Sequence, residues 1–345
     1  MIWCQNKVDV WQRSDKLKGG FIVSRNSDIQ VSVHMITYNH EPYIRECLES
    51  ILSQRTDFRF EVVIGEDCSP DNTRAIVLEY QDRYPDIVRV LESTKNLGSN
   101  LNAQRVKEAC RGKYLAFIEG DDYWNHPRKL QMQYDFLESH PDYGLVCSEH
   151  DEFVHSEQRL IPAAQVSAGK GYVTTPTIYD ILSNKADILT CTVMAERELV
   201  MEVIAADPEL YGTRYKMGDT QLWSELVMRK KCHRMPESLA TRRIIAESAT
   251  RSADEIKVTE FWLSNSEMCL YLCEKYQLSQ QLRREISKLW RRRALKLAVM
   301  KADHKLASQV KRNVPDFSFK DHCWYYLSSL PWLSRIAYRL GVVHR

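Results

Sequence analysis

Hydrophobic residues follow two alternating patterns along residues 30–150 of the chain. Short runs rich in β-branched residues predict strands, and each is followed by a segment with an apolar residue at every third or fourth position, which predicts a helix. The predicted strands are 31–37, 60–65, 87–93, 113–119 and 143–150. The predicted helices between them are 41–54, 69–84, 100–110 and 126–141. This alternation predicts βαβ units, and therefore an α/β fold with a mostly parallel, Rossmann-like sheet flanked by helices.

The pattern is less regular beyond residue 150. Helical periodicity is present in 177–184 and 217–231, whereas 188–196 and 237–245 have the composition of strands. From about residue 256 nearly the whole chain has a helical pattern. We therefore expect three parts, which are an N-terminal arm (1–29), an α/β domain (30–250) and a helical C-terminal extension (251–345).

Composition narrows the class of protein. The 345 residues are 44% apolar and 27% charged, as in ordinary globular proteins. No apolar run approaches the length of a membrane span, and the first twenty residues lack the apolar segment of a secretory signal, so we expect a cytoplasmic protein. The ten cysteines include no Cys-x-x-Cys pair, which favours reduced thiols over a structural zinc site.

The net charge of +2 conceals a basic C-terminal end. Residues 283–345 contain 15 Lys and Arg against 4 Asp and Glu, a net +11, which leaves −9 for the rest. The aromatic and large apolar residues between these basic ones are Trp324, Tyr325, Tyr326, Leu330, Trp332, Leu333 and Tyr338. They indicate either an interfacial segment on an anionic membrane, or packing against the α/β domain or a second subunit. Because the body is acidic, no nucleic-acid partner is expected.

Candidate chemistry lies at the ends of the predicted strands. In parallel α/β sheets, ligands bind beyond the carboxyl ends of the strands. The segments there are "TYNHE" (37–41), "GEDCSPDNT" (65–73), "TKNLGSN" (94–100) and "EGDDYW" (119–124). All four are rich in small polar residues, and three of them are acidic.

The segment "EGDDYW" places three carboxylates within four positions. Like charges repel one another, and hard divalent cations prefer oxygen ligands, so a bound cation would offset them. In an extended backbone Glu119 and Asp121 point to the same side, and Gly120 lets the chain bend toward a ligand. The alternative is a solvated acidic turn that only caps the following helix.

The segment "GEDCSPDNT" allows two interpretations. A carboxylate of Glu66 or Asp67 can accept a hydrogen bond from the imide N–H of uracil or thymine. Alternatively, Asp67 and Asp71 only organise a turn, because Ser-Pro-Asp is typical of a helix N-cap. Both interpretations can hold for different residues, with Asp71 as the cap.

Three longer segments together resemble the inverting family 2 glycosyltransferases of the GT-A type. They are "VSVHMITYNHEPYIRECLESIL", "FEVVIGEDCSPDNT" and "YLAFIEGDDYWNHPRKLQMQYDFLE", and the resemblance covers roughly 30–250. It implies a nucleotide-binding half (30–125) and an acceptor half (126–250). It also implies a nucleoside diphosphate sugar as donor, with UDP or dTDP expected, a Mg²⁺ or Mn²⁺ ion, and a glycan or lipid-linked acceptor.

The resemblance also implies roles for single residues. Those expected at the nucleotide are Thr37, Tyr38, Asn39, Glu41, Glu66, Asp67, Asn96, Gly98, Glu119 and Gly120. Asp121 matches the last Asp of the family's Asp-x-Asp motif and would hold the metal. Asp219 in "KMGDTQLW" matches the catalytic base, with a plain N-cap as the alternative interpretation and Glu225 as the fallback base.

Two further features concern the acceptor half. Arg242 and Arg243 stand where many relatives have a Tyr-Arg-x-His loop, and either would contact the diphosphate or simply extend from a strand edge; no His follows them. The Gln-x-x-Arg-Trp motif of processive synthases is absent, which favours transfer of one sugar per binding event.

Two other functions compete with this interpretation. A nucleotidyltransferase would have a glycine-rich phosphate loop after the first strand, and 37–43 contains none. A non-catalytic nucleotide-sugar binding protein would have altered metal and base positions, whereas Asp121 and Asp219 are both present. The expected role is therefore synthesis of a surface polysaccharide or similar glycan, at the inner face of the plasma membrane if the C-terminal end binds there. Formation of a homo-oligomer stays open.

Overall fold

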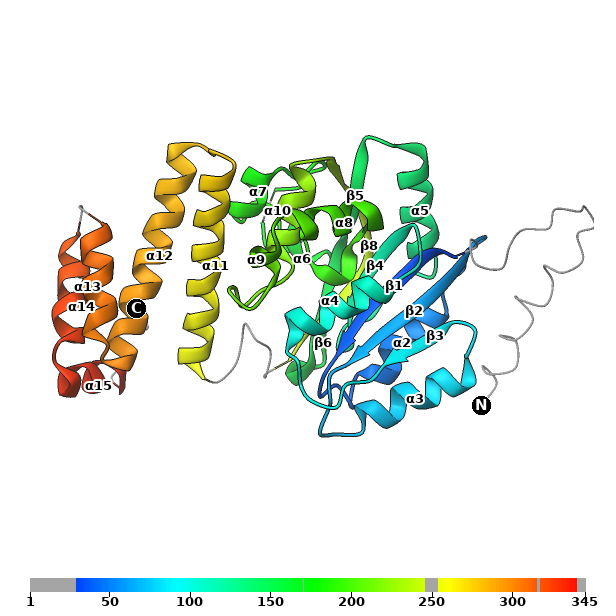
Figure 1. The fold of residues 1–345 in the computed structure, drawn as a ribbon, viewed down its shortest axis with the longest axis horizontal. Helices are drawn as coiled ribbons and strands as arrows, with labels where there is room; N and C mark the ends of the chain where they lie inside the picture. Colours follow the sequence, from blue (N-terminus) through cyan, green and yellow to red (C-terminus); the bar gives the residue numbers. More distant parts are fainter. Residues whose placement is uncertain (1–28, 170, 246–253, 315–316, 340–345) are drawn as a thin grey trace, which may run out of the picture.

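The computed structural model describes residues 29–169, 171–245, 254–314 and 317–339. Its centre is an eight-stranded sheet in the order β3–β2–β1–β4–β7–β5–β6, with β8 paired to β5 (Figure 1). The first four strands run parallel to one another, as predicted. They are β1 (Ile29–Thr37), β2 (Arg59–Glu66), β3 (Val88–Leu91) and β4 (Tyr114–Glu119). The predicted α/β fold is confirmed.

Both faces of the parallel half of the sheet are buried. Val62 and Ile64 of β2 belong to the apolar cluster on one face, whereas Val63 between them belongs to the cluster on the other. Burial on both faces explains why these strands appear in the sequence as continuous apolar runs. The first face is covered by α2 (Ile44–Leu52), α3 (Thr73–Arg83) and α5 (Lys129–Ser139), and α4 (Ser99–Ala109) packs on the second.

The second half of the sheet is mixed. The short strand β7 (Met194–Glu196) lies antiparallel between β4 and β5 (Tyr143–Val154). An edge strand, β6 (Arg159–Ile161), pairs antiparallel with β5, whereas the long β8 (Lys231–Ile244) runs parallel to it.

The prediction of a strand over 188–196 was correct only for its last three residues. Thr190–Thr192 form a 3-10 turn, η3, instead of the start of a strand. The Thr192 hydroxyl donates a hydrogen bond to the Leu189 carbonyl oxygen at 2.7 Å, a local bond that competes with strand pairing.

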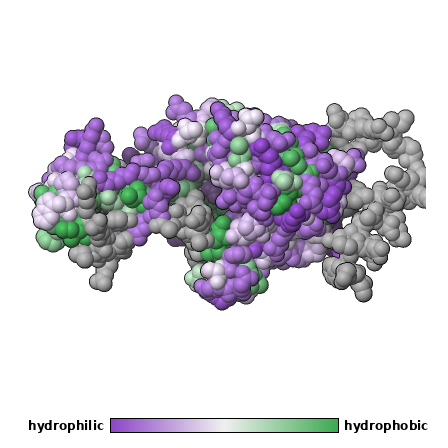
Figure 2. Space-filling view, turned by 90° about the horizontal axis from the view of Figure 1, so that it is seen from below, coloured by the Kyte–Doolittle hydropathy of each residue, from purple (hydrophilic) through white to green (hydrophobic). Residues whose placement is uncertain are grey.

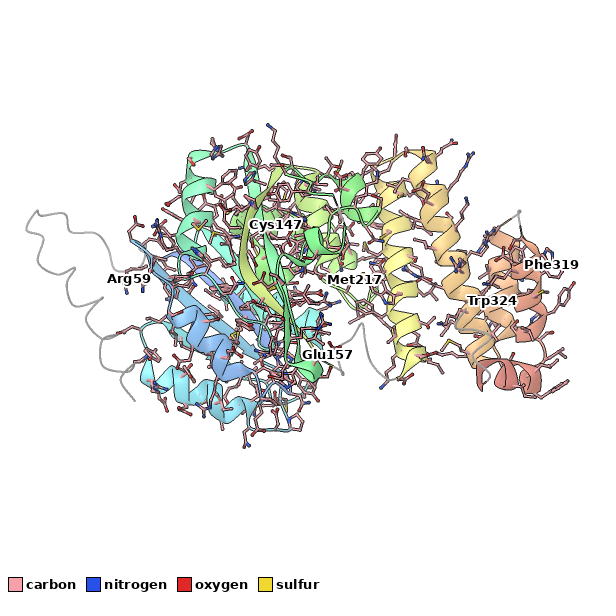
Figure 3. All side chains as sticks on the ribbon, turned by 180° about the vertical axis from the view of Figure 1, so that it is seen from behind. Arg59, Cys147, Glu157, Met217, Phe319 and Trp324 are labelled. Atoms are coloured by element: carbon pink, nitrogen blue, oxygen red, sulfur yellow. The ribbon has the colours of Figure 1, made fainter. Side chains whose placement is uncertain are left out.

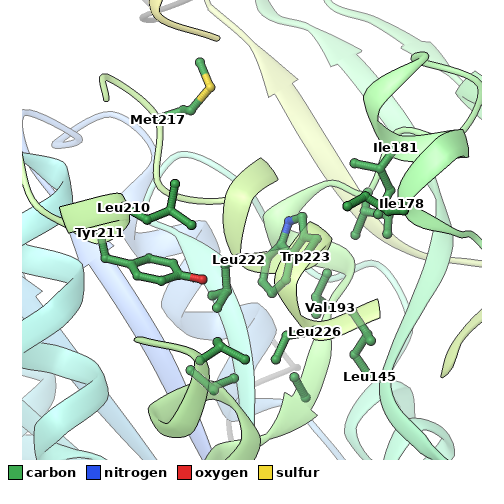
Figure 4. Close-up of a cluster of buried hydrophobic side chains, with 14 of the residues drawn as sticks. Leu145, Ile178, Ile181, Val193, Leu210, Tyr211, Met217, Leu222, Trp223 and Leu226 are labelled. Atoms are coloured by element: carbon green, nitrogen blue, oxygen red, sulfur yellow. The ribbon is translucent and has the colours of Figure 1, made fainter. Parts of the chain in front are cut away.

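A large apolar cluster surrounds α10 (Thr220–Val227). Leu222, Trp223 and Leu226 point from α10 into this cluster (Figure 4). The Trp223 ring meets Phe117 of β4 edge-on, with ring centroids 5.1 Å apart. This packing fixes the position of α10 against the sheet. The other short helices of this half are η2 (His155–Glu157), α6 (Ala164–Ser167), α7 (Ile178–Leu182), α8 (Arg197–Ala206) and α9 (Pro208–Tyr211).

The C-terminal region is helical, as predicted. Figure 1 shows α11 beside the α/β body, α12 next to it, and α13–α15 at the end farthest from the sheet. Met268 and Leu272 of α11 and Leu282 of α12 belong to the same cluster as α10, so the first two helices share the core of the body. The five helices are α11 (Glu255–Lys275), α12 (Gln280–Lys301), α13 (His304–Asn313), α14 (Phe319–Ser328) and α15 (Pro331–Arg339).

A buried ion-pair network joins α10 to α11. The carboxylate of Glu225, which is fully buried, lies 2.9 Å from Lys275 Nζ and accepts a hydrogen bond from the Tyr276 hydroxyl at 2.7 Å. Arg229 lies 3.2 Å from the same carboxylate. Lys275 also pairs with Asp207 at 2.7 Å, at the junction of α8 and α9. Glu225 is thus an anchor for α11, and its carboxylate is not free to act as the fallback base.

Three further expectations concern the N-terminal arm, membrane-spanning helices and the cysteines. The N-terminal arm lies outside the described residues, except for Ile29, which begins β1. Within the described ranges, no helix combines the length and hydropathy needed to cross a bilayer. The nine cysteines in these ranges are free thiols, and most are buried, as expected for small core residues.

The substitution Glu225→Ala should destabilise the protein by about 2–3 kcal/mol, since it removes one partner of a buried ion pair. We place the cost below the full value for such a pair because Lys275 keeps Asp207 as a partner. Urea unfolding followed by far-UV circular dichroism measures the change. Glu79→Ala, which breaks the exposed pair with Arg45, is the matched control and should have little effect. An equal loss in both variants would contradict the anchoring role.

Candidate functional site

Three loops begin side by side at the carboxyl edge of the parallel strands. Thr37 of β1 is in register with Glu66 of β2, and Ile36 is in register with Glu119 of β4. The Gly120 N–H donates a hydrogen bond to the Ile36 carbonyl oxygen at 3.0 Å, so the pairing continues into the loop. The segments 37–41, 65–73 and 119–124, chosen from the sequence, therefore meet at one edge.

The first and second loops are locked together by hydrogen bonds. The Glu41 N–H donates to Asp71 Oδ2 at 3.0 Å, and the Glu41 carboxylate accepts from the Asn72 N–H and side-chain amide at 3.1 and 2.7 Å. Asp71 also accepts a hydrogen bond from the Thr73 N–H at 3.0 Å, but the N-cap residue of α3 is Asn72, so Asp71 acts from one position before the cap. In this arrangement Glu41 braces two loops.

Glu66 shapes the second loop from inside. Its side chain is fully buried and accepts hydrogen bonds from the N–H groups of Cys68 and Ser69 at 3.2 and 2.7 Å. Arg74 Nε lies 2.6 Å from the same carboxylate. With both oxygens engaged, Glu66 holds the loop in place and does not project toward a ligand.

Asp67 connects the second loop to the segment 96–98. Its carboxylate accepts hydrogen bonds from the N–H groups of Leu97 and Gly98 at 2.8 and 2.9 Å. Gly98 has a φ of +83°, which an L-residue rarely adopts, and its N–H also donates to Asn96 Oδ1 at 3.0 Å. Asp67, Asn96 and Gly98, which the resemblance assigned separately, thus form one unit.

The side chains of the first loop differ in exposure. Tyr38 is 44% exposed, whereas Thr37 behind it is buried. Asn39 has a φ of +59°, a conformation that Asn tolerates, and its N–H donates to Ser69 Oγ at 3.1 Å. The Tyr38 ring is therefore exposed to solvent at the carboxyl edge of the sheet, and hydrogen bonds hold the backbone next to it in place.

The turn after β4 concentrates negative charge. Burial raises the pKa of Glu119 well above its ordinary value, and the neighbouring carboxylates of Asp122, Asp121 and Asp219 raise it further. Burial, followed by the charge of Asp121, raises the pKa of Asp122 to about 7. Such a cluster favours a bound proton or a bound cation.

Arg243 of β8 holds this turn from behind. Its N–H donates to Asp122 Oδ1 and its Nε–H donates to the Asp121 carbonyl oxygen, both at 2.8 Å. The guanidinium also pairs with Glu46 at 2.5 Å and lies over the Tyr123 ring. Its side chain is only 4% exposed, so it positions the turn and is not available for the diphosphate contact that the sequence suggested.

Arg242 is more accessible than Arg243. Its side chain is 30% exposed, and its Nη1 atom lies 3.6 Å from Glu152 Oε1. Of the two arginines, only Arg242 therefore stays a candidate for a phosphate contact.

Gly120 is required because two side chains approach it closely. A Cβ at this position would lie 2.5 Å from Thr37 Oγ1 and 2.8 Å from His40 Nδ1. The missing side chain thus lets the His40 ring lie against the acidic turn, where His40 Nε2 is 3.9 Å from Asp121 Oδ1. His40 lies in the loop 37–41, which the resemblance assigns to the nucleotide, but no role of its own was predicted for it.

Asp219 caps α10 and also lies near the acidic turn. Its Oδ1 accepts a hydrogen bond from the Thr220 N–H at 2.6 Å, and its charge contributes to the raised pKa of Glu119. Asn100 of α4 holds the preceding loop by donating to the carbonyl oxygens of Gly212 and Tyr215 at 3.1 and 2.9 Å. The capping interpretation and the proximity expected of a base are therefore both consistent with the geometry. Asn100 ends the segment 94–100 that was singled out from the sequence, but no role of its own was predicted for it.

The carboxylates of the turn after β4 suit a hard divalent cation that is bound partly by the protein and partly by a substrate. Within the described ranges, no group of three or more His, Cys, Asp and Glu side chains could enclose a metal ion. Mg²⁺ and similar ions are commonly held by one or two carboxylates plus substrate phosphates. The half-buried carboxylate of Asp121, beside the ionisable Glu119, fits this second type of site.

Comparison with known sequences is consistent with this geometry. A model of glycosyl transferase family 2 matches residues 32–185. Rv1520 of Mycobacterium tuberculosis, an uncharacterized protein, is 46% identical over 117 residues, which cover 34% of each chain. The chain thus matches about a third of the length of that relative. TuaG of Bacillus subtilis, named as a teichuronic acid biosynthesis glycosyltransferase, is 28% identical over 63% of this chain and 80% of its own.

Solved structures show the same fold at low sequence identity. Residues 1–349 of S. aureus TarS, in complex with UDP-GlcNAc, give a TM-score of 0.54 at 18% identity, over 91% of this chain and 92% of that one. The mannosyltransferase PcManGT from Pyrobaculum calidifontis, with GDP-Man and Mn²⁺, gives 0.53 at 15% identity, over 95% and 92%. These likenesses, together with the family match, confirm the predicted GT-A fold.

The substitution Gly120→Ala should disrupt the edge, because the added Cβ would overlap Thr37 and His40. We expect a lower thermal unfolding midpoint, measured by circular dichroism. Gly171→Ala is the matched control, since nothing lies within 4 Å of a Cβ built there. Equal unfolding midpoints for both variants would show that the contacts at Gly120 do not constrain the turn.

Proposed function

We propose that the chain transfers one sugar from a nucleoside diphosphate sugar to an acceptor hydroxyl, with inversion, because a model of glycosyl transferase family 2 matches residues 32–185. One observation carries the proposal. Asp219, the N-cap residue of α10, lies near the acidic turn after β4: burial raises the pKa of Glu119 most, and the charges of Asp122, Asp121 and Asp219 raise it further. A single displacement requires a metal-binding carboxylate near the leaving group and a base near the attacking hydroxyl, and Asp121 and Asp219 are the candidates for these two roles.

We assign the nucleotide to the loops around Asp67 and Tyr38. The exposed Tyr38 ring offers a surface on which a base can stack, and Thr37 and Asn39 flank it. Asp67 is buried and accepts one backbone N–H on each carboxylate oxygen, but each oxygen keeps a second lone pair that would accept a hydrogen bond from an imide N–H. This chemistry favours UDP or dTDP as the carrier.

Asp121 is the residue that would hold Mg²⁺ or Mn²⁺ on the diphosphate. When bound, the cation supplies electrostatic stabilisation of the negative charge that develops on the leaving group. Arg243 keeps the turn in place through the Asp121 carbonyl oxygen, which leaves the carboxylate of Asp121 for the cation. Arg242 is partly exposed on the same strand and is a second source of positive charge.

Asp219 would accept the proton of the attacking hydroxyl. The Thr220 N–H fixes its Oδ1, so the orientation of the carboxylate is set before the acceptor binds. The other oxygen, Oδ2, then takes the proton as the hydroxyl attacks the anomeric carbon from the face opposite the diphosphate. Because the reaction is one displacement, the anomeric configuration inverts and no protein nucleophile is needed.

Asp219→Asn should lower turnover by on the order of 10²- to 10⁴-fold while nucleotide affinity stays within about twofold, because it removes only the base. Release of nucleoside diphosphate from UDP-, dTDP- and GDP-sugars measures turnover.

Asp121→Asn should instead weaken Mn²⁺-dependent binding of the nucleotide. Calorimetry with UDP, dTDP and GDP measures this binding. Asp82→Asn, at an exposed position on α3, is the control. If none of these nucleotides binds, the proposal is wrong.

We further propose that the far end of the helical region docks on an anionic membrane that carries a lipid-linked acceptor. Phe319, Tyr326 and Trp332 of α14 and α15 are 86%, 58% and 62% exposed. Figure 2 shows apolar surface among hydrophilic surface at this end of the molecule. Exposed aromatic side chains beside basic ones are typical of interfacial binding.

The aromatic residues of this end divide between the two interpretations of the sequence. Trp324 is buried and belongs to the core cluster of α12–α14, whereas Phe319 points outward (Figure 3). Packing therefore accounts for Trp324, and Tyr326 and Trp332 remain available for a surface. The name of TuaG, which refers to teichuronic acid biosynthesis, supports the proposed role in glycan synthesis. The exposed aromatic residues of this end support the proposed location at the inner face of the plasma membrane.

Replacing Phe319 and Trp332 by Ala should abolish most of the binding to vesicles that contain phosphatidylglycerol. The wild-type chain should bind these vesicles more weakly as salt increases and should bind pure phosphatidylcholine vesicles poorly. Co-sedimentation measures both. Leu160→Ala, at an apolar position 49% exposed on β6, is the matched control. Equal binding by the double variant and the wild type would exclude this end as the docking surface.

A further inference from the structure

We propose that His40 is a second protein ligand of the divalent cation at Asp121 and gives the site a preference for Mn²⁺ over Mg²⁺. The inference rests on the proposed function, because it concerns the same cation. Its starting point is the separation of 3.9 Å between His40 Nε2 and Asp121 Oδ1. Two donors that are each about 2.1 Å from one ion lie no more than about 4.2 Å apart, so this separation can accommodate a shared ion.

The orientation of the His40 ring is that of a metal ligand. Its Nδ1 atom is 3.2 Å from Thr37 Oγ1, within hydrogen-bond distance, which leaves Nε2 facing Asp121. Metal-binding histidines almost always use the nitrogen remote from the metal for such a hydrogen bond, because it fixes both tautomer and ring orientation. Thr37, which the resemblance assigned to the nucleotide, has this positioning role here.

The backbone of His40 is also held in place. Its N–H donates to Thr73 Oγ1 at 2.8 Å, and its carbonyl oxygen accepts from the N–H groups of Tyr43 and Ile44, both at 2.9 Å. The ring itself lies in the space that Gly120 leaves open. His40 is therefore preorganised, and little conformational entropy is lost when an ion binds.

The chemistry of the two donors predicts the selectivity. Imidazole nitrogen suits several first-row transition metals, and Mg²⁺ and Mn²⁺ both take carboxylate and water oxygens, but Mg²⁺ keeps most of its water and demands near-ideal octahedral geometry. Mn²⁺ accepts both donors, so it gains from His40 in a way that Mg²⁺ does not. With only two protein ligands, the remaining positions are filled by diphosphate oxygens and water, which agrees with the lack of a three-residue cage within the described ranges.

The competing interpretation is a direct ion pair, in which a protonated His40 neutralises Asp121. The two interpretations predict opposite effects of removing the imidazole. A cationic His40 competes with the metal, so its loss would tighten metal binding. A liganding His40 contributes a donor, so its loss weakens binding of Mn²⁺.

The experiment measures binding of Mn²⁺ and Mg²⁺ to the full chain with UDP or dTDP as the probe. His40→Gln should weaken Mn²⁺ affinity by at least about tenfold and change Mg²⁺-supported nucleotide affinity by less than about threefold. In protein labelled with ¹⁵N-histidine, pulsed electron paramagnetic resonance should detect a nitrogen coupled to Mn²⁺, and this coupling should disappear in His40→Gln. His126→Gln, in the segment after the same turn, is the control and should retain the coupling.

Three results would overturn the inference. They are no nitrogen coupling in the wild type, an equal loss for both metals in His40→Gln, or tighter Mn²⁺ binding in that variant. In each of these cases, a loss of Mn²⁺-dependent nucleotide binding in Asp121→Asn would show that the proposed function stands. If Asp121→Asn has no effect either, the proposed metal site itself is wrong.

Discussion

The site depends on holding several carboxylates close together against their mutual repulsion. Two unit charges 4 Å apart repel by about 4 kcal/mol in the effective dielectric of a protein surface. The turn at 119–122 keeps its conformation because Arg243 donates hydrogen bonds to the Asp121 carbonyl oxygen and to the Asp122 carboxylate. Since Arg243 belongs to β8, the acidic turn of the first half is completed only when the second half has folded.

The strand-end carboxylates divide into two groups by their partners. Those of Glu41, Glu66 and Asp71 are engaged by backbone N–H groups or by side chains of the loops that they join. Asp121, by contrast, is held through its backbone, and Asp219 through one carboxylate oxygen, so both keep carboxylate oxygens for chemistry. The carboxylates of the first group hold the loops in place, whereas those of Asp121 and Asp219 remain available to a ligand.

The sequence predicted the parallel half of the fold well because burial on both faces leaves an unmistakable apolar run. It also located Thr37, Glu119 and their neighbours, since strand ends follow directly from the strands. It did not distinguish Arg242 from Arg243. Adjacent residues on a strand point to opposite faces, and which one points inward depends on the register of β8 against β5, which shifts at several points.

Other features were hidden because they depend on contacts between distant segments. Glu66 and Asp67 are adjacent and chemically alike, and only the position of Arg74 and of the 97–98 segment separates their roles. Asn100 carries no motif, yet it ties α4 to the loop before Asp219. Glu225 resembled a fallback base until Lys275 and Tyr276, fifty residues onward, proved to occupy it.

The shared core of α10 and α11 has a consequence for modularity. Met268 and Leu272 complete the apolar cluster around Trp223, and Lys275 neutralises the buried Glu225 of the same helix. Exchange of the helical region for that of a relative would therefore leave the core of the α/β body incomplete. Recombination that imported a foreign α11 would have to import a matching α10 as well. The helix that Asp219 caps and the segment beyond residue 254 are therefore expected to change together in evolution.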